Sequence, residues 1–186
     1  FNAIMATVSE GDEVIIPAPY WVSYPEMVRM CGGISVIVET TAENGWKLTA
    51  EQFEEAMTPR TKMVILTTPN NPTGSVYSEE ELRALGEVAL SEDILILADE
   101  IYEHLVYGDT KHVSIASLSP ELYDLTITIN GVVRNVTFKG VHYEILVETE
   151  LRTYKVQTTD YAEVGRQVGL KFGRWLDVVD YELLLS

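Results

Sequence analysis

Five short, nearly continuous apolar runs constrain the fold of residues 1–130 more than any other feature of this chain. The runs cover residues 12–17, 34–38, 62–68, 94–98 and 125–129. Between them lie helix signals at 24–31, 49–57 and 79–90. Strands that are apolar along their whole length are covered on both faces, which is typical of a sheet packed between helices. We therefore expect an α/β fold here, with ligands binding beyond the carboxyl ends of its strands.

The pattern changes after Asn130. Short β-rich segments follow at 132–138, 143–147, 154–158 and 168–172, and no helix-period segment separates them. This predicts a small all-β hairpin assembly, barrel-like in form. We therefore expect two domains, an α/β domain over 1–130 and a β module over 131–186, and the stretch from 173 onward has no assignment.

The distribution of charge supports the same boundary. The net charge is −16, and residues 1–130 hold 21 of the 29 acidic side chains but only 6 of the 13 Lys and Arg. Residues 131–186 are close to neutral, so the two parts differ in electrostatic character. An acidic surface repels phosphate backbones, which argues against nucleic acid as a partner.

Composition also bears on location and metal binding. No apolar run approaches membrane-spanning length and no secretory signal is visible, so we expect a soluble, cytoplasmic protein. Cys31 is the only cysteine, which excludes an internal disulfide and a cysteine-cluster metal site, and we expect no metal site. An opening without Met, inside a helix-like segment, suggests a fragment.

Two polar clusters follow neighbouring apolar runs. Pro-Asn-Asn-Pro-Thr-Gly at 69–74 follows the third run, and Asp-Glu-Ile-Tyr at 99–102 follows the fourth. At the carboxyl ends of two buried strands they could converge on one crevice. On spacing alone each also has a purely structural explanation, since Asn-Pro-Thr-Gly is good turn chemistry and Asp is an ordinary helix N-cap.

Taken together, these segments resemble those of the class I/II aminotransferases that use pyridoxal 5'-phosphate (PLP), especially the bacterial aspartate-type branch. The matching segments are 19–25 (Pro-Tyr-Trp-Val-Ser-Tyr-Pro), 69–74, 99–103 and Asn130-Gly131, in the family's order and spacing. The resemblance covers about residues 1–131. It implies part of a three-layer aminotransferase-type sheet with helices on both faces, a homodimer, and transfer of an amino group between an amino acid and a 2-oxo acid.

The resemblance also implies roles for four residues of the cofactor site. Trp21 would stack on the pyridine ring, and Asn71 and Tyr102 would donate hydrogen bonds to the ring's phenolic oxygen. Asp99 would pair with the protonated ring nitrogen, which keeps the ring able to accept electrons. The structural alternatives are a core aromatic for Trp21 and a helix cap for Asp99.

One position departs from the family pattern. The lysine that holds the coenzyme lies four residues after the asparagine of the Asn-Gly pair, and here that position is Arg134. A guanidinium stays protonated and cannot act as the amine nucleophile. The nearest amine, Lys139, lies in a predicted turn and is a poor substitute, because catalysis tolerates little misplacement. We therefore expect no catalytic residue, PLP held non-covalently at best, and a chain that is not competent alone.

The tail resembles a different family. Segments 136–144, 156–160, 163–165 and 168–170 are similar to those of the TOBE domain, a small OB-like β module of the ATP-binding subunits of spermidine/putrescine ABC importers. The resemblance covers about 131–173. It implies polyamine-transporter subunits as partners and makes Arg134 and Lys139 surface residues. No phosphate-binding loop of an ATPase is present in the sequence.

Three hypotheses remain open from the sequence, so whether the chain is an enzyme is undecided. The first is an aminotransferase-type enzyme, or its cofactor-binding part. The second is a non-enzymatic binding or regulatory module of the TOBE type. The third is a recombined chimera with no selected activity.

Overall fold

A computed structural model describes residues 1–128, 131–138, 143–148, 153–158, 164–165, 167–172 and 181–184, and it describes side chains for 1–128 and 164–165. The chain divides into two compact units, Phe1–Thr128 and Ile129–Ser186. Each unit is described by itself below. Within the described residues, no helix is long and apolar enough to cross a membrane.

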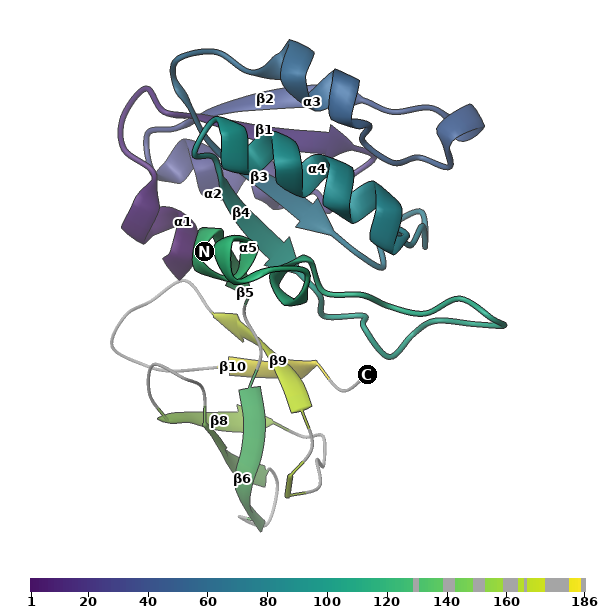
Figure 1. Cartoon of the computed structure of the whole chain (residues 1–186). Helices are drawn as coiled ribbons and strands as arrows, with labels where there is room; N and C mark the ends of the chain where they lie inside the picture. The colour runs from purple at the N-terminus through teal and green to yellow at the C-terminus, as the bar shows by residue number, and fades with distance from the viewer. Residues whose placement is uncertain are drawn as a thin grey trace. The chain divides into compact units, whose positions relative to one another are not determined.

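The first unit contains a five-stranded sheet in the order β2-β1-β3-β4-β5 (Figure 1). The strands are β1 (Glu13–Ala18), β2 (Ile34–Glu39), β3 (Thr61–Thr67), β4 (Leu95–Asp99) and β5 (Thr126–Thr128). All neighbouring pairs are parallel. The carboxyl ends of all five strands therefore lie at one edge of the sheet.

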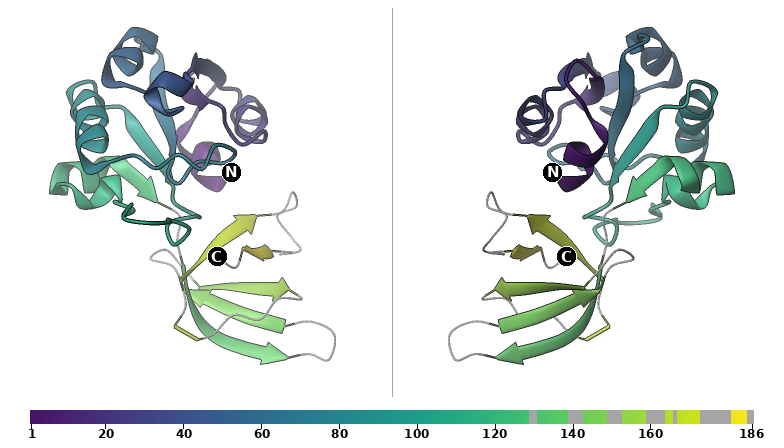
Figure 2. Two further views of the ribbon diagram at one scale, coloured as in Figure 1. Left: turned by 90° about the vertical axis from the view of Figure 1, so that its right-hand side faces the viewer. Right: turned by 90° about the vertical axis from the view of Figure 1, so that its left-hand side faces the viewer.

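Helices cover both faces of this sheet (Figures 1 and 2). They are α1 (Asn2–Thr7), α2 (Tyr24–Met30), α3 (Ala50–Ala56), α4 (Glu79–Ser91) and α5 (Pro120–Leu125), with 3₁₀ turns η1 (Ala42–Asn44) and η2 (Ile115–Ser117). The helices α3, α4 and α5 pack on one face, and α1 and α2 pack on the other. The unit is therefore a three-layer α/β structure.

The alternation of side chains along the strands explains why two separate cores form. In β3, Val64 and Leu66 belong to the core under α3 and α4, whereas Met63 and Ile65 belong to the core under α1 and α2. All four side chains are at most 2% exposed. Successive residues of a strand point to opposite faces, so an uninterrupted apolar run fills both cores.

Local sequence signals fix the start of two helices. The Ser78 hydroxyl accepts a hydrogen bond from the Glu81 amide, and the Glu81 carboxylate accepts one from the Ser78 amide, which is a complete capping box for α4. Thr49 and Gln52 make the same reciprocal pair at the start of α3. These are the caps that the sequence predicts.

The predicted strands and helices of residues 1–130 are confirmed to within one or two residues at their ends. The structure adds elements that the sequence reading did not assign, namely η1, η2 and α5. The strand β5 begins one residue later than the apolar run that predicts it, because Leu125 ends α5 and the Thr126 amide donates to the Tyr123 carbonyl. Residues 129 and 130 lie outside the described residues.

The described strands of the second unit form a separate five-stranded sheet in the order β10-β9-β6-β7-β8. They are β6 (Gly131–Phe138), β7 (Tyr143–Glu148), β8 (Thr153–Thr158), β9 (Gln167–Phe172) and β10 (Tyr181–Leu184). All pairs are antiparallel. Four of the strands lie where β segments are predicted, and β10 falls in the stretch that has no assignment from the sequence.

Candidate functional site

Three loops meet at the carboxyl edge of the parallel sheet. They follow β1, β3 and β4, which are neighbours in the sheet, and Figure 1 shows the arrowheads of these strands on the same side. In the sheet, β2 lies on one side of β1 and β3 lies on the other. The direction of strand order therefore reverses at β1, and the carboxyl ends of β1 and β3 mark a topological switch point. Open α/β sheets bind ligands at such points. Trp21 and Asn71 lie on two of these loops, and Asp99 is the last residue of β4.

Asp99 is anchored by a buried tyrosine from another element. The Tyr24 hydroxyl, at the start of α2, donates a hydrogen bond of 2.5 Å to Asp99 Oδ2. Tyr24 also shares a 2.9 Å hydrogen bond with the Thr67 hydroxyl at the end of β3. The Ile101 amide donates to the other carboxylate oxygen of Asp99 at 3.3 Å. The carboxylate therefore has a defined orientation at the end of β4.

The environment keeps the Tyr24 hydroxyl protonated. Burial raises the pKa of Tyr24 far above its ordinary value, and the negative charge of Asp99 and the hydrogen bond to it raise it further. A protonated phenol can only help the carboxylate as a donor, which is the role the geometry gives it. Sequence reasoning read Tyr24 as the first residue of a helix and missed this pairing. The available signal was its place in the Pro-Tyr-Trp-Val-Ser-Tyr-Pro segment.

Trp21 lies in the same neighbourhood. Its ring packs edge-on against the Tyr24 ring, with centroids 5.5 Å apart and planes at 84°. It is only partly buried, against the core that also holds Tyr24 and Ile65. A tryptophan held in this way keeps part of its surface free of the core. Two of the four predicted cofactor-binding residues, Trp21 and Asp99, therefore contact Tyr24.

The loop after β3 is closed by backbone hydrogen bonds and tied to the loop after β1. The Asn70 amide donates to the Ser75 carbonyl, and the Gly74 amide donates to the Asn70 carbonyl. The Asn70 side chain donates to the Pro19 carbonyl at 3.3 Å, which joins the two loops. Asn71 lies half-buried at the first turn position of this closed loop, and its side chain makes none of the hydrogen bonds that define the loop.

Tyr102 lies half-buried in the turns after β4. Tyr102 is the smallest of the causes that raise the pKa of Tyr24. The backbone at Arg134 lies in β6, where the pairing with β7 shifts register between Val133 and Asn135. Lys139 lies outside the described residues.

A small cavity lies beneath these loops. Its volume is about 10 Å³, and its lining includes Tyr20, Tyr24, Thr67 and Asn70. A space of this size holds about one water molecule. Neither Trp21 nor Asp99 lines this cavity, so it is not the place of a ring held by those two residues.

A parallel sheet between two helix layers, with an aromatic ring and an anchored carboxylate at its carboxyl edge, is typical of α/β proteins that bind a ligand there. Comparison with known proteins identifies the family. The sequence model of aminotransferase class I and II matches residues 1–140. The chain belongs to the class I and II aminotransferase family.

Two curated relatives show how much of a family member the chain represents. It is 55% identical over 140 residues to an aspartate aminotransferase of Geobacillus stearothermophilus, a match that covers 75% of this chain and 36% of that protein. It is 50% identical over 141 residues to a probable aspartate/prephenate aminotransferase of Rhizobium leguminosarum bv. phaseoli, covering 75% and 35%. The chain thus spans about a third of the length of these relatives.

Solved structures give the same result for the fold. An aspartate aminotransferase from Rhizobium meliloti is 46% identical, with a TM-score of 0.68 over 70% of this chain and 33% of that chain. An aspartate aminotransferase from Thermus thermophilus, solved with maleate, is 48% identical, with a TM-score of 0.65 over 70% and 33%. The aminotransferase-type fold of the first unit is thereby confirmed. The TOBE resemblance of the tail is untested by these matches and stays a prediction.

The cofactor of this family is PLP. The donor set of the described residues fits its pyridine ring. Asp99 offers an oriented carboxylate that can accept a hydrogen bond from a ring N–H, and Trp21 offers an aromatic surface beside it. The fit concerns the ring only, and the expectation that Arg134 stands at the family's lysine position stays a prediction from the sequence.

Proposed function

We propose that this chain is the cofactor-binding part of an aminotransferase, an enzyme that moves an amino group between an amino acid and a 2-oxo acid. The observation that carries the proposal is the Tyr24–Asp99 hydrogen bond beside Trp21. A protonated pyridine ring requires a fixed carboxylate and a flat apolar surface. Asp99, held by Tyr24, provides the first, and Trp21 provides the second. The sequence identity to aminotransferases over 140 residues supports it further.

Each side chain has a separate task in this proposal. Asp99 accepts a hydrogen bond from the ring nitrogen and favours its protonated form, while Tyr24 holds the carboxylate in place. Trp21 stacks on the ring. Asn71 and Tyr102 donate hydrogen bonds to the phenolic oxygen. The bound coenzyme supplies an electron sink, which stabilises the charge that develops when the substrate loses its α-proton.

We also propose that the chain alone does not complete the reaction. Arg134 stands at the lysine position and cannot attack an aldehyde, because its guanidinium stays protonated. The coenzyme would therefore bind reversibly, through its ring. A homodimer and a cytoplasmic location, which the resemblance implies, stay predictions, as does the division into domains at residue 130.

A PLP titration of the full chain tests the proposal. We expect saturable binding, followed through the coenzyme's absorbance, that is about 10- to 100-fold weaker in Asp99→Asn, because a hydrogen bond to a charged group contributes about 1.5–3 kcal/mol. Asp93→Asn is the matched control, because Asp93 is exposed and its φ of 56° suits asparagine equally well. Equal affinity of the wild type and Asp99→Asn would contradict the proposal.

A second candidate function concerns the tail. The antiparallel sheet β10-β9-β6-β7-β8 is compatible with a TOBE-type binding or regulatory module related to polyamine import. Calorimetry with spermidine tests it. Tight, saturable binding that PLP does not affect would favour this function for the second unit, and its absence would leave a recombined chimera as the alternative.

A further inference from the structure

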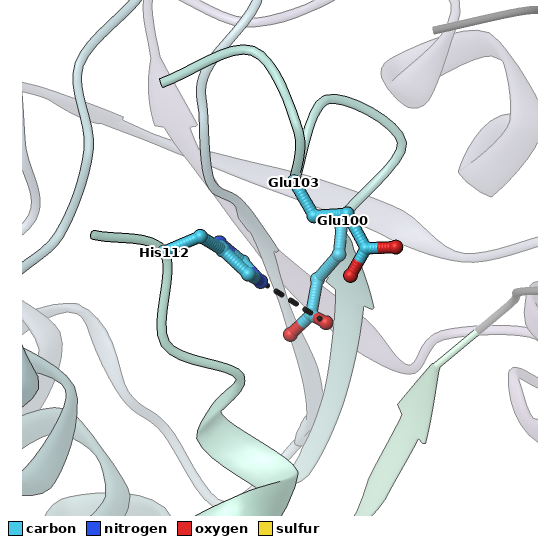
Figure 3. Close-up of side chains that lie close together, drawn as sticks. All are labelled: Glu100, Glu103 and His112. Atoms are coloured by element: carbon cyan, nitrogen blue, oxygen red, sulfur yellow. Dashed lines mark ion pairs between the residues drawn. The ribbon is translucent and has the colours of Figure 1, made fainter. Parts of the chain in front are cut away.

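Three potential metal ligands converge on the first unit, apart from the residues assigned to the coenzyme. Glu100 and Glu103 lie in the turns that follow β4, and His112 lies in the segment that leads to η2. One ligand atom from each lies within 4.8 Å of the other two. Figure 3 shows the Glu100 carboxylate beside the His112 ring, with Glu103 approaching from the same turn as Glu100.

The inner two side chains are buried without hydrogen-bond partners. The Glu100 side chain is 8% exposed and the His112 side chain 11% exposed. Glu100 Oε1 and both ring nitrogens of His112 are inaccessible to solvent and have no hydrogen-bond partner among the residues that the structure describes. A buried carboxylate is costly unless it is paired or bound to a metal, and nearly all buried polar atoms have a partner. Apart from the His112–Glu100 ion pair, drawn as a dashed line in Figure 3, the described part of the chain offers these atoms no partner.

The spacing of the two side chains fits a shared metal ion better than a direct hydrogen bond. His112 Nε2 lies 3.4 Å from Glu100 Oε2. Hydrogen bonds from N–H to oxygen have lengths of about 2.7–3.2 Å. Two ligand atoms that each lie about 2.0–2.1 Å from a tetrahedral zinc ion are about 3.3 Å apart. The observed separation matches the second geometry.

We propose that Glu100, Glu103 and His112 bind a divalent first-row transition metal, with zinc as the reference ion. Imidazole and carboxylate oxygens are both ligands of zinc. Two carboxylates and a neutral imidazole carry a charge of −2, which one divalent ion balances. Glu103 is 27% exposed and forms the rim of the site, open to a water molecule as fourth ligand. The proposal departs from the sequence expectation of no metal site.

The role of this site is structural. Asp99 and Glu100 are adjacent, but Asp99 accepts from Tyr24 whereas Glu100 faces His112. An ion held by Glu100, Glu103 and His112 joins the turns after β4 to the segment before η2. It thereby stabilises the segment that carries Asp99 and Tyr102 without contacting the coenzyme position. The inference is independent of the proposed function.

Calorimetric titration of the full chain with Zn²⁺, in a buffer that does not chelate metals, tests the proposal. We expect one zinc ion to bind per chain, with an affinity at least about tenfold lower in His112→Gln and in Glu100→Gln. Substitution of a residue that only hydrogen-bonds to a metal ligand lowers metal affinity by about 10- to 100-fold, and loss of the ligand itself should cost no less. Zn²⁺ also raises the melting temperature of the wild type and has less effect on these variants.

His104→Gln is the matched control. His104 is 60% exposed and lies 3.4 Å from the Glu103 carboxylate, yet it is not among the converging ligands. We expect its zinc affinity to stay within about twofold of the wild type. Glu103→Gln is the ligand substitution expected to disturb folding least, because Glu103 is partly exposed. It must also lower the affinity for zinc. Absence of a saturable equivalent, or equal affinity in His112→Gln, Glu103→Gln and the wild type, would overturn the proposal.

Discussion

Tyr24 and Asp99, 75 positions apart in the sequence, are joined by a 2.5 Å hydrogen bond at the carboxyl edge of the sheet. The bond connects the start of α2 with the end of β4. Because the Tyr24 phenol is buried and remains protonated, it always presents a donor to the carboxylate. The orientation of Asp99 is therefore set before any ligand binds, which is the preorganisation that a cofactor site requires.

Removing the Tyr24 hydroxyl tests this link. In Tyr24→Phe, Asp99 loses a donor and the Thr67 hydroxyl loses its partner. We expect the free energy of unfolding to fall by about 1–3 kcal/mol, the typical cost of leaving buried polar groups unpaired. PLP affinity should fall as well, since the carboxylate is less well oriented. Urea unfolding and coenzyme titration measure the two effects.

Tyr123→Phe is the control for this substitution, because Tyr123 is 58% exposed. It should change neither quantity measurably. If Tyr24→Phe also left PLP affinity unchanged, Tyr24 would be a core residue with no part in the site.

Alkaline pH should destabilise the first unit. Burial is the main cause that raises the pKa of Tyr24 and of Tyr77. Above about pH 10, unfolded tyrosines release protons that these two keep in the folded state. The unfolded state then binds fewer protons, so the free energy of unfolding decreases as pH rises, by up to about 1.4 kcal/mol per pH unit for each group. Stability from this source is fully present below pH 10.

Unfolding curves between pH 8 and 11 measure this slope. Tyr24→Phe should make the fall of the unfolding free energy with pH less steep, because only Tyr77 then contributes. Tyr107→Phe should leave the slope unchanged, since Tyr107 is 81% exposed. An identical slope in all three proteins would show that Tyr24 titrates normally and is accessible to water.

Two N-cap serines provide a matched test of helix capping. The Ser78 hydroxyl accepts a hydrogen bond from the Glu81 amide at the start of α4, whereas Ser23, at the N-cap of α2, makes no such bond. Ser78→Ala should therefore lower the free energy of unfolding by about 1 kcal/mol, and Ser23→Ala by much less. Chemical denaturation measures both, and equal losses would contradict the capping account.

Much of the first unit could be predicted from local sequence. Apolar runs predict strands because both faces of this sheet are covered, and Thr49 and Ser78 predict helix starts because their caps involve residues only three positions away. The helix α5 was missed. Its signal, Ser119 as N-cap followed by Pro120, marks a helix of only 6 residues, too short for a 3.6-residue period to be visible.

The candidate site could be predicted only in part. Trp21 and Asp99 are recognisable because they stand in segments that resemble a known family. Their connection through Tyr24 depends on the strand order β1-β3-β4, which local patterns do not encode. The same holds for Glu100 and His112, which are brought together by the path of the chain between β4 and η2. Contacts of this kind require the tertiary structure.

The central claim is that the coenzyme ring binds beside Asp99 without a covalent bond. Borohydride reduction tests this claim most directly. The full chain is mixed with PLP at saturating concentration, reduced, digested and analysed by mass spectrometry, with Asp99→Asn treated in parallel. The account predicts saturable binding that depends on Asp99 and no stoichiometric label on any lysine. A stoichiometric label on one lysine, Lys139 above all, that disappears in Asp99→Asn would contradict it.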